Sequence, residues 1–215
     1  WQMIFYVLAI YALIIFVFSF YFLPEVKSAK KPQELSAIQR YKIVFSNKKA
    51  RLDLISSMMV SLAFFAYITA IPFVYLTVFK VSEFTFSLLF GANVLALMSA
   101  HLINTRLVTR IGSRKMLSYG VLLAIIAATS LLLANVLSLA LPFHVAAILP
   151  LMGSLSMISV NANALILQEF TEHTGTATAV NGTLRFGIGA LAGPILAVFY
   201  DGSALPFACL MAVSV

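Results

Sequence analysis

The chain has 215 residues, of which 62% are hydrophobic and only 10% are charged. Because soluble domains carry about a quarter charged residues, this composition excludes a soluble enzyme and a soluble nucleic-acid binder, and it places the chain in a lipid bilayer. The net charge of +7 does not indicate a nucleic-acid-binding face, because eight of the 14 basic residues lie at 27–51 and four more at 106–115. The chain begins at Trp1, inside an apolar stretch, which suggests a part of a longer protein.

Apolar stretches of membrane length follow one another along the chain. A bilayer core of about 30 Å needs roughly 20 apolar residues in a helix, and six stretches meet this requirement, whereas a seventh is too short. In chain order they are residues 3–23, 54–79, 84–103, 116–134, 142–167 and 177–200, followed by the short 204–215. None of them alternates polar and apolar residues with the period of a strand. The predicted fold class is therefore an all-α polytopic membrane protein.

The gaps between these stretches predict which side of the membrane each connection faces. Cytoplasmic loops carry an excess of Lys and Arg, so the basic gaps at 24–53 and 104–115 are predicted to be cytoplasmic. The gaps at 80–83 and 135–141 hold one basic residue, Lys80, and are predicted to lie on the other side. The gap at 168–176 should be cytoplasmic by alternation, although it contains no Lys or Arg.

The gap at 24–53 also predicts a domain boundary. It separates a transmembrane helix at 1–23 from a membrane bundle at 54–215, whose last helix is incomplete, and it forms a cytoplasmic linker between them. Four apolar residues of the linker recur at helical spacing: Leu35, Ile38, Tyr41 and Phe45. This spacing indicates a short amphipathic helix at the membrane surface, with basic residues near anionic lipid. A flexible connector with chance periodicity is the alternative, and the spacing does not separate the two.

Two polar segments resemble those of one transporter superfamily, the major facilitator superfamily. Leu23-Pro24-Glu25 resembles the end of its sixth helix, although Val26 stands where Thr often follows. The run Asn104-Thr-Arg-Leu-Val-Thr-Arg-Ile-Gly-Ser-Arg-Lys115 resembles its cytoplasmic loop between helices eight and nine. Gly112 can take the positive φ of a tight turn there. The cations of this loop motif are placed to face helix C-termini: Arg106, Arg110 and Arg114.

Segments within the spans resemble one branch of that superfamily, the bicyclomycin and chloramphenicol resistance (Bcr/CflA) drug exporters. They are similar to its seventh, eighth, tenth and eleventh helices: Phe64–Tyr75, Phe86–Asn93, Asn161–Asn163 and Gly175–Gly182. The resemblance covers the whole chain but only the second part of the family layout, its sixth helix and its six-helix C-terminal bundle. Arg185 departs from it, because an uncharged polar residue is expected there.

The resemblance implies a secondary active transporter, a proton-coupled multidrug exporter of the inner membrane that works by alternating access. Its partners would be a drug-like small molecule, a proton, the lipid bilayer and the missing N-terminal half of the same protein. No cofactor, metal or nucleic acid is implied.

Other functions remain as alternatives. An exporter of a small metabolite, such as an amino acid or a sugar, is the alternative within the superfamily, and the scarcity of intramembrane carboxylates favours drugs over sugars. A channel would need a charged ring or a filter, and an intramembrane enzyme would need a catalytic constellation. Neither is evident in the sequence.

Arg185 is the most informative residue in the spans. It lies about eight residues, or roughly 12 Å, inside the sixth stretch, where a charged side chain costs about 2.5–3.5 kcal/mol even on a lenient insertion scale. Such a residue normally faces a water-filled cavity or a partner. We therefore predict that Arg185 lines the central cavity and contacts a substrate or an acidic residue. Snorkelling to the interface, or bracing two helices, is the alternative.

Three further residues are candidate cavity-lining groups: Asn93, Asn161 and Tyr67. The two amides are polar groups in apolar spans, and an interhelical hydrogen bond is their alternative and, for any single Asn, the more common role. Tyr67 lies near Pro72, which tends to kink a helix, and aromatic side chains at a kink suit bulky apolar drugs.

Other polar and small residues are given structural interpretations. Gly189 and Gly193 form a G-x-x-x-G pair, which permits close packing within the bundle. Three carboxylates lie at span ends, where an ordinary solvated group is expected: Asp53, Glu169 and Glu172. The three His are scattered and show no metal-ligand spacing.

Overall fold

The computed structural model describes residues 2–22, 36–171 and 174–215, which belong to two compact units. The first unit contributes one described helix, α1 (Gln2–Phe22), whose 21 residues include no charged side chain. Every residue of α1 is exposed, and most of its side chains are large and hydrophobic. A helix that is hydrophobic all round is typical of a membrane span.

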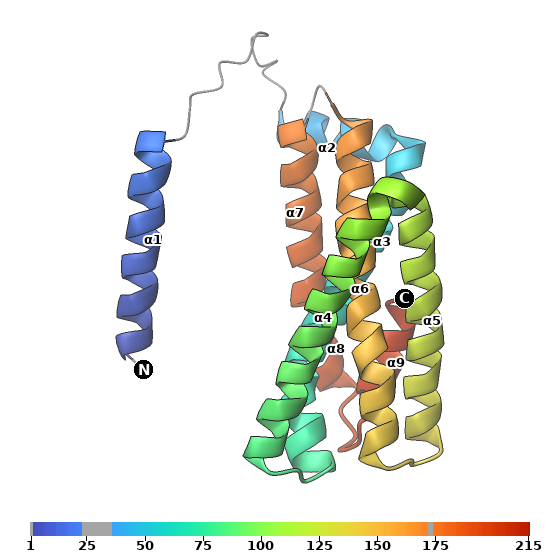
Figure 1. Cartoon of the computed structure of the whole chain (residues 1–215). Coiled ribbons are helices and arrows are strands. Elements are labelled where there is room, and N and C mark those ends of the chain that lie inside the picture. Colours follow the sequence, from blue (N-terminus) through green and yellow to red (C-terminus); the bar gives the residue numbers. More distant parts are fainter. Residues whose placement is uncertain (1, 23–35, 172–173) are drawn as a thin grey trace. The chain divides into compact units, whose positions relative to one another are not determined.

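The second unit, Ser36–Val215, is a bundle of helices (Figure 1). In chain order they are α2 (Ala37–Ser46), α3 (Lys48–Pro72), the π-helix η1 (Phe73–Val78), α4 (Glu83–Ile111), α5 (Ser113–Val136), α6 (Leu141–Glu169), α7 (Thr174–Ala190), α8 (Ala192–Val198) and α9 (Leu205–Val213). The described residues contain helices and no strand. The predicted all-α class is therefore confirmed.

Polar side chains set where several of these helices begin. The first N–H groups of a helix have no partner within the helix, and a side chain before it can supply one. Ser36 and Gln39 form a reciprocal capping box at the start of α2. The Asn47 side-chain oxygen accepts hydrogen bonds from the backbone N–H groups of Lys49 and Ala50, at 3.0 and 3.2 Å. Asn47 is thus the single residue between the end of α2 at Ser46 and the start of α3 at Lys48.

Gly112 alone joins α4 to α5. Its φ of +85° and ψ of 150° fall in a region that is essentially restricted to glycine. This is the tight turn that the sequence indicated. The rest of the 104–115 segment is helical, because Arg106 and Arg110 continue α4 while Arg114 lies in the first turn of α5.

The sixth expected span is interrupted. Among the described residues, the helical stretches long and apolar enough to cross a membrane are α1, α3 with η1, α4, α5 and α6. In the stretch 177–200, α7 ends at Ala190 and α8 begins at Ala192. Pro194 has no N–H to donate to the Ala190 carbonyl. At the same place the Leu191 N–H donates to the Ile188 carbonyl, three residues back, at 3.1 Å. The sixth expected stretch is therefore two shorter helices separated at Leu191 rather than one uninterrupted helix.

The short helix α2 packs against α3 and α7. Val44 is fully buried and belongs to a cluster with Leu54 of α3 and Val180 of α7. Of the residues predicted to share its apolar face, Leu35 lies outside the described residues and Ile38 is exposed. Residues 37–46 are thus helical, and Val44, rather than Ile38, anchors this helix to the bundle.

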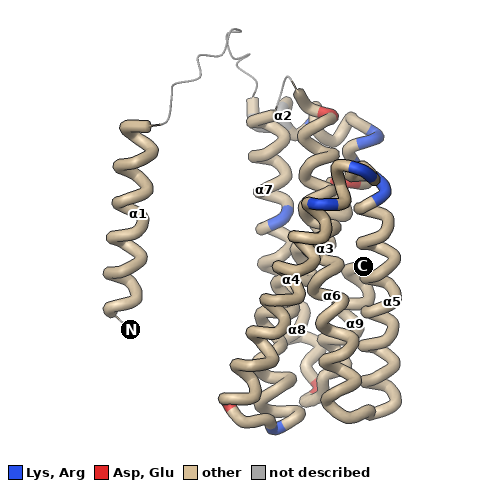
Figure 2. The backbone as a smooth tube through the Cα atoms, viewed as in Figure 1, with Lys and Arg blue, Asp and Glu red and all other residues tan. Residues whose placement is uncertain are grey.

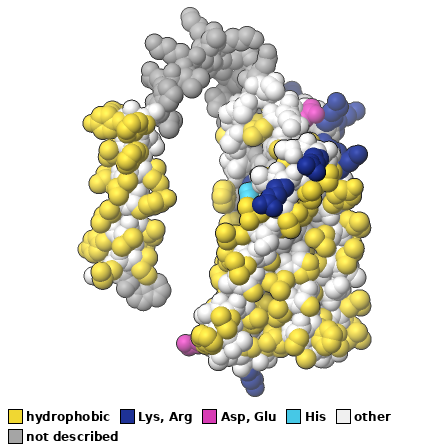
Figure 3. Space-filling view, viewed as in Figure 1, with side chains coloured by type: hydrophobic (Ala, Val, Ile, Leu, Met, Phe, Trp, Pro, Cys, Tyr) yellow, Lys and Arg dark blue, Asp and Glu magenta, His cyan; other side chains and the backbone are white. Residues whose placement is uncertain are grey.

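The core of the bundle is centred on α6, which packs against α5, α3 and α4. Large side chains of α6 with no exposed surface include Ile148, Leu151 and Met152. Lys and Arg residues gather at one end of the bundle, where α4 turns into α5 and where α3 begins (Figure 2). We call this the basic end. Below it, the visible face of the bundle is largely hydrophobic (Figure 3), as a lipid-facing surface requires.

Candidate functional site

A cavity of about 310 Å³ lies between α3, α4, α6 and α7. Its lining combines one cation with hydroxyl and phenyl groups: Arg185, Ser61, Ser156, Ser159, Phe64, Phe65 and Phe186. Small-molecule sites are commonly concave, mainly apolar and furnished with a few polar groups. We call this the Arg185 cavity.

Arg185 stands well inside the bundle. It follows Thr174, the first residue of α7, by 11 positions, or about 16 Å of helix. Its side chain is half-buried, and Nη2 donates a hydrogen bond to Ser159 Oγ of α6 at 3.1 Å. Among the described residues, no carboxylate forms an ion pair with it. Since a guanidinium has five N–H donors, most of its donors are not engaged by the described part of the chain.

The aromatic wall of the Arg185 cavity depends on Gly189. A Cβ at Gly189 would stand 2.5 Å from Phe65 Cδ2, closer than any real contact, whereas a Cβ at Gly193 would meet nothing within 4 Å. The predicted close packing therefore applies to Gly189 only. Because the α7 backbone leaves this space, the Phe65 ring can lie edge-on to Phe186, with ring centroids 6.2 Å apart.

Tyr67 and Asn93 are buried elsewhere, between α3, η1 and α4. Tyr67 stacks on Phe90, and Tyr75 of η1 lies edge-on to Phe86. Among the described residues, the hydroxyls of both tyrosines and the Asn93 Oδ1 atom find no hydrogen-bond partner. The Asn93 Nδ2 group donates to the Leu89 carbonyl of its own helix at 2.8 Å. Tyr75 lies near the end of its apolar stretch, where a lipid-facing aromatic belt is expected, but its side chain is fully buried.

Asn161 forms an interhelical hydrogen bond, the alternative that the sequence offered to a place in the cavity wall. Its Nδ2 donates to Asn104 Oδ1 of α4 at 2.6 Å. A second amide pair joins α7 to α6, where Asn181 Nδ2 donates to Asn163 Oδ1 at 2.6 Å. Neighbouring amides on α6 therefore bind two different helices.

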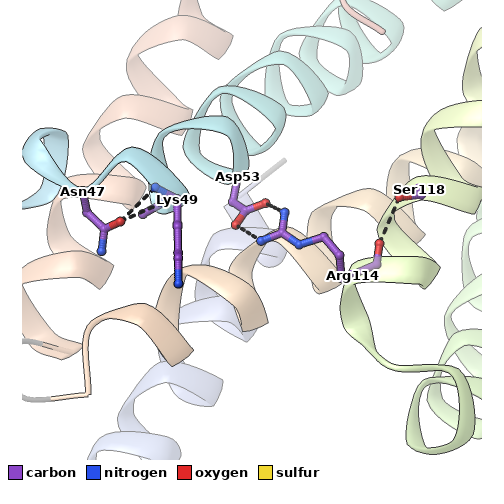
Figure 4. Close-up of polar contacts among 6 residues, drawn as sticks. Asn47, Lys49, Asp53, Arg114 and Ser118 are labelled. Atoms are coloured by element: carbon purple, nitrogen blue, oxygen red, sulfur yellow. Dashed lines mark hydrogen bonds and ion pairs between the residues drawn. The ribbon is translucent and has the colours of Figure 1, made fainter.

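The strongest polar contact lies at the basic end and joins α3 to α5 (Figure 4). Arg114 donates from Nη1 to Asp53 Oδ1 at 2.6 Å and from Nη2 to Asp53 Oδ2 at 2.9 Å. The Asp53 side chain is fully buried, whereas that of Arg114 is 53% exposed. The expectation that Asp53 is a solvated carboxylate is therefore wrong. A carboxylate without water around it requires such a partner.

The predicted residues thus fall into separate places. Arg185 lines its cavity, Tyr67 and Asn93 share the α3–α4 contact, and Asn161 bridges α4 and α6. Within the loop motif Arg114 binds Asp53, whereas Arg106 and Arg110 are exposed. One signal for Asp53 was present, since ionisable residues of membrane helices usually face the bundle interior and pair with one another.

These features define a class of protein. The chain is a polytopic, all-α membrane protein in which the charged side chain of Arg185 borders a cavity between helices. Charged side chains inside the membrane usually mark a substrate or ion pathway.

The family follows from comparison with known proteins. The sequence pattern of the Major Facilitator Superfamily matches residues 1–194, and the chain belongs to this superfamily. Its members are generally transporters rather than enzymes.

Two relatives refine this assignment. The bicyclomycin resistance protein homolog of Haemophilus influenzae is 28% identical over 209 residues, which cover 96% of this chain and 52% of the relative. The uncharacterized MFS-type transporter YdgK of Bacillus subtilis is 30% identical over 150 residues, which cover 70% of this chain and 37% of the relative. The chain thus spans about half the length of these relatives or less. The resemblance noted in the sequence is confirmed.

Proposed function

We propose that this chain is the C-terminal part of a proton-coupled multidrug exporter that works by alternating access in the inner membrane. The observation that carries the proposal is the similarity to a bicyclomycin resistance protein homolog along 96% of the chain. Alternating access requires two bundles that rock about a site between them. Because the bundle at 54–215 is only one of these, the N-terminal half of the same protein supplies the other.

The Arg185 cavity supports this proposal. In the complete exporter Arg185 lines the substrate cavity directly, because it already borders an open space. Asn93, Asn161 and Tyr67 are buried between helices, so they reach the substrate only when the helices around them rearrange. The proton binds in the N-terminal half, since the buried carboxylate of the described bundle, Asp53, is already held by Arg114.

The orientation in the membrane is part of the proposal. The basic end faces the cytoplasm, which places the linker at 24–53 and the loop motif with Arg106, Arg110, Gly112 and Arg114 on that side. Ser36 is exposed, so a Ser36→Cys variant reports the side of the linker once the exposed Cys209 is replaced by Ser. A membrane-impermeant thiol reagent applied to intact cells should leave it unlabelled and label it after lysis. Labelling from outside would reverse the orientation.

Drug sensitivity of an exporter-deficient bacterial host tests the function. The complete protein should raise the tolerated concentration of several structurally different drugs, and a protonophore should abolish drug extrusion. The 215-residue chain expressed alone is the matched control and should confer nothing, because it offers one bundle. Unchanged sensitivity with the complete protein in the membrane would reject drug export. Extrusion of an amino acid or sugar instead would support the metabolite exporter.

A further inference from the structure

The guanidinium of Arg185 has one hydrogen-bond acceptor among the described residues, and this leaves room for a ligand. The acceptor is Ser159 Oγ, at 3.1 Å from Nη2. A guanidinium presents its donors in a planar fork that matches the two oxygens of a carboxylate. In a low-dielectric bundle a cation without a counter-charge is unfavourable. An anionic group entering the cavity would therefore gain both hydrogen bonds and charge neutralisation.

The same chain shows what a matched partner looks like. At the basic end, Asp53 supplies both carboxylate oxygens to Arg114 at 2.6 and 2.9 Å. At Arg185 no described side chain supplies that carboxylate. Arg114 has a carboxylate partner and Arg185 does not have one among the described residues. A carboxylate of a ligand would supply the group that Arg185 lacks.

The remaining lining determines the body of the ligand. Phe64 and Phe65 are edge-on with ring centroids 6.1 Å apart, and Phe65 and Phe186 are edge-on at 6.2 Å. Aromatic rings pack favourably on such edge-to-face arrangements. Ser61 and Ser156 also line the cavity, so they are candidates to bind a further polar atom.

We propose that the Arg185 cavity binds a flat aromatic molecule that carries a carboxylate, with the carboxylate on Arg185 and the ring against Phe64, Phe65 and Phe186. The inference rests on the proposed function, and it names the substrate class: anionic or zwitterionic aromatic compounds rather than cationic ones. The part of the cavity that this bundle lines has a volume of about 310 Å³, which lies within the range of small-molecule sites and is enough for one or two fused rings.

Equilibrium binding of two matched probes to the complete protein in lipid nanodiscs tests this inference. The probes are naphthoate and its neutral amide, and the change in naphthyl fluorescence reports binding. The wild-type protein should bind naphthoate about tenfold more tightly than the amide, as a charge-assisted pair predicts. Arg185→Gln should remove that preference and leave the affinity for the amide within about twofold, because the cavity remains. Arg185→Lys should keep part of the preference, since the charge stays but the fork is lost.

A second variant pair checks the aromatic wall. Gly189→Ala displaces Phe65 and should weaken both probes by a similar factor, whereas Gly193→Ala should weaken neither. Equal binding of the two probes by the wild-type protein would overturn the inference. So would an equal loss of both probes in Arg185→Gln, since Arg185 would then be a brace that shapes the cavity.

The outcomes separate the inference from the proposed function. Binding needs no proton gradient, so a protein that prefers naphthoate but confers no drug resistance would leave the site standing and reject export. A protein that confers resistance without preferring naphthoate would reject the site and leave export standing.

Discussion

Arg114 and Arg185 lie in the same bundle, yet their guanidinium groups face different surroundings. Arg114 is more exposed and is held by both oxygens of a fully buried carboxylate. Arg185 is half-buried in the middle of the bundle and is held by one serine hydroxyl. The better-solvated arginine thus has the stronger partner. Satisfied pairs fix helices in place, whereas a cation with unused donors is available to something that enters.

The largest expected effect separates the two arginines by stability. Arg114→Ala leaves the Asp53 carboxylate buried without its partner and should lower the free energy of unfolding by about 1–3 kcal/mol, a range discounted for the exposure of Arg114. Arg185→Ala removes the single hydrogen bond to Ser159 and should change the free energy of unfolding by less than about 1 kcal/mol. Denaturation in mixed micelles, followed by circular dichroism, measures both. Equal losses would erase the distinction.

The double variant Asp53→Ala/Arg114→Ala provides the control for this experiment. Removing both partners also removes the unpaired buried charge, so the double variant should be more stable than the sum of the single losses implies. Additive losses would show that the two residues act independently.

The next largest loss of stability is expected for Gly189→Ala, which changes the packing beside the Arg185 cavity. The added Cβ forces Phe65 to move. Overpacking typically costs about 1–3 kcal/mol, and the low end of that range is expected here because Phe65 borders an open cavity. The matched Gly193→Ala variant gains a methyl group in open space and should be neutral or slightly stabilising. The same denaturation assay compares them, and indistinguishable variants would mean that Phe65 adapts freely.

A neutral contact should matter less than the charged pair at the basic end. The bond between Asn161 and Asn104 is 2.6 Å long, but interhelical bonds of this type contribute only about 0.6 kcal/mol on average. Asn104→Ala should therefore destabilise the bundle by less than Arg114→Ala in the same assay. A larger loss would place the amide pair above the ion pair.

The smallest effect is expected at an exposed carboxylate in the connection between α8 and α9. The Ser203 hydroxyl and backbone N–H donate to Asp201 at 2.7 and 2.8 Å and hold the pKa of that carboxyl below its usual value. A carboxyl whose pKa is lower in the folded state stabilises the protein at pH values above its ordinary pKa of about 4. This stabilisation is lost as the pH falls through the folded-state pKa. Asp201→Asn should flatten this small acid-side slope of stability, measured by unfolding at a series of pH values. An unchanged slope would assign it to other carboxylates.

The class and the order of the spans could be predicted, because the bilayer imposes a length and a composition that apolar stretches display directly. The turn at Gly112 could be predicted for a similar reason, since only a local backbone conformation was needed. The interruption at Leu191 has a local cause too, the missing N–H of Pro194. A hydropathy pattern does not reveal that cause, because it measures how apolar a stretch is and not which backbone N–H groups are missing.

The candidate site was harder to predict because its contacts join distant parts of the chain. Asp53 and Arg114 are separated by 61 positions, and no spacing rule connects α3 to the start of α5. Arg185 was found because charge at that depth is unusual in any membrane helix. Its neighbours Phe65 and Gly189 were not found as a pair, because their contact depends on how closely α3 and α7 approach.

The single-residue link at Gly112 has a practical consequence for protein engineering. Its φ of +85° excludes side chains, and an extra residue would turn α5 about its axis and move Arg114 away from Asp53. Epitope tags, fusion partners and permuted termini should therefore avoid this link, even though it is exposed and looks accessible. The connection from Phe199 to Ala204 tolerates such insertions better, since it already contains non-helical residues that no buried ion pair depends on.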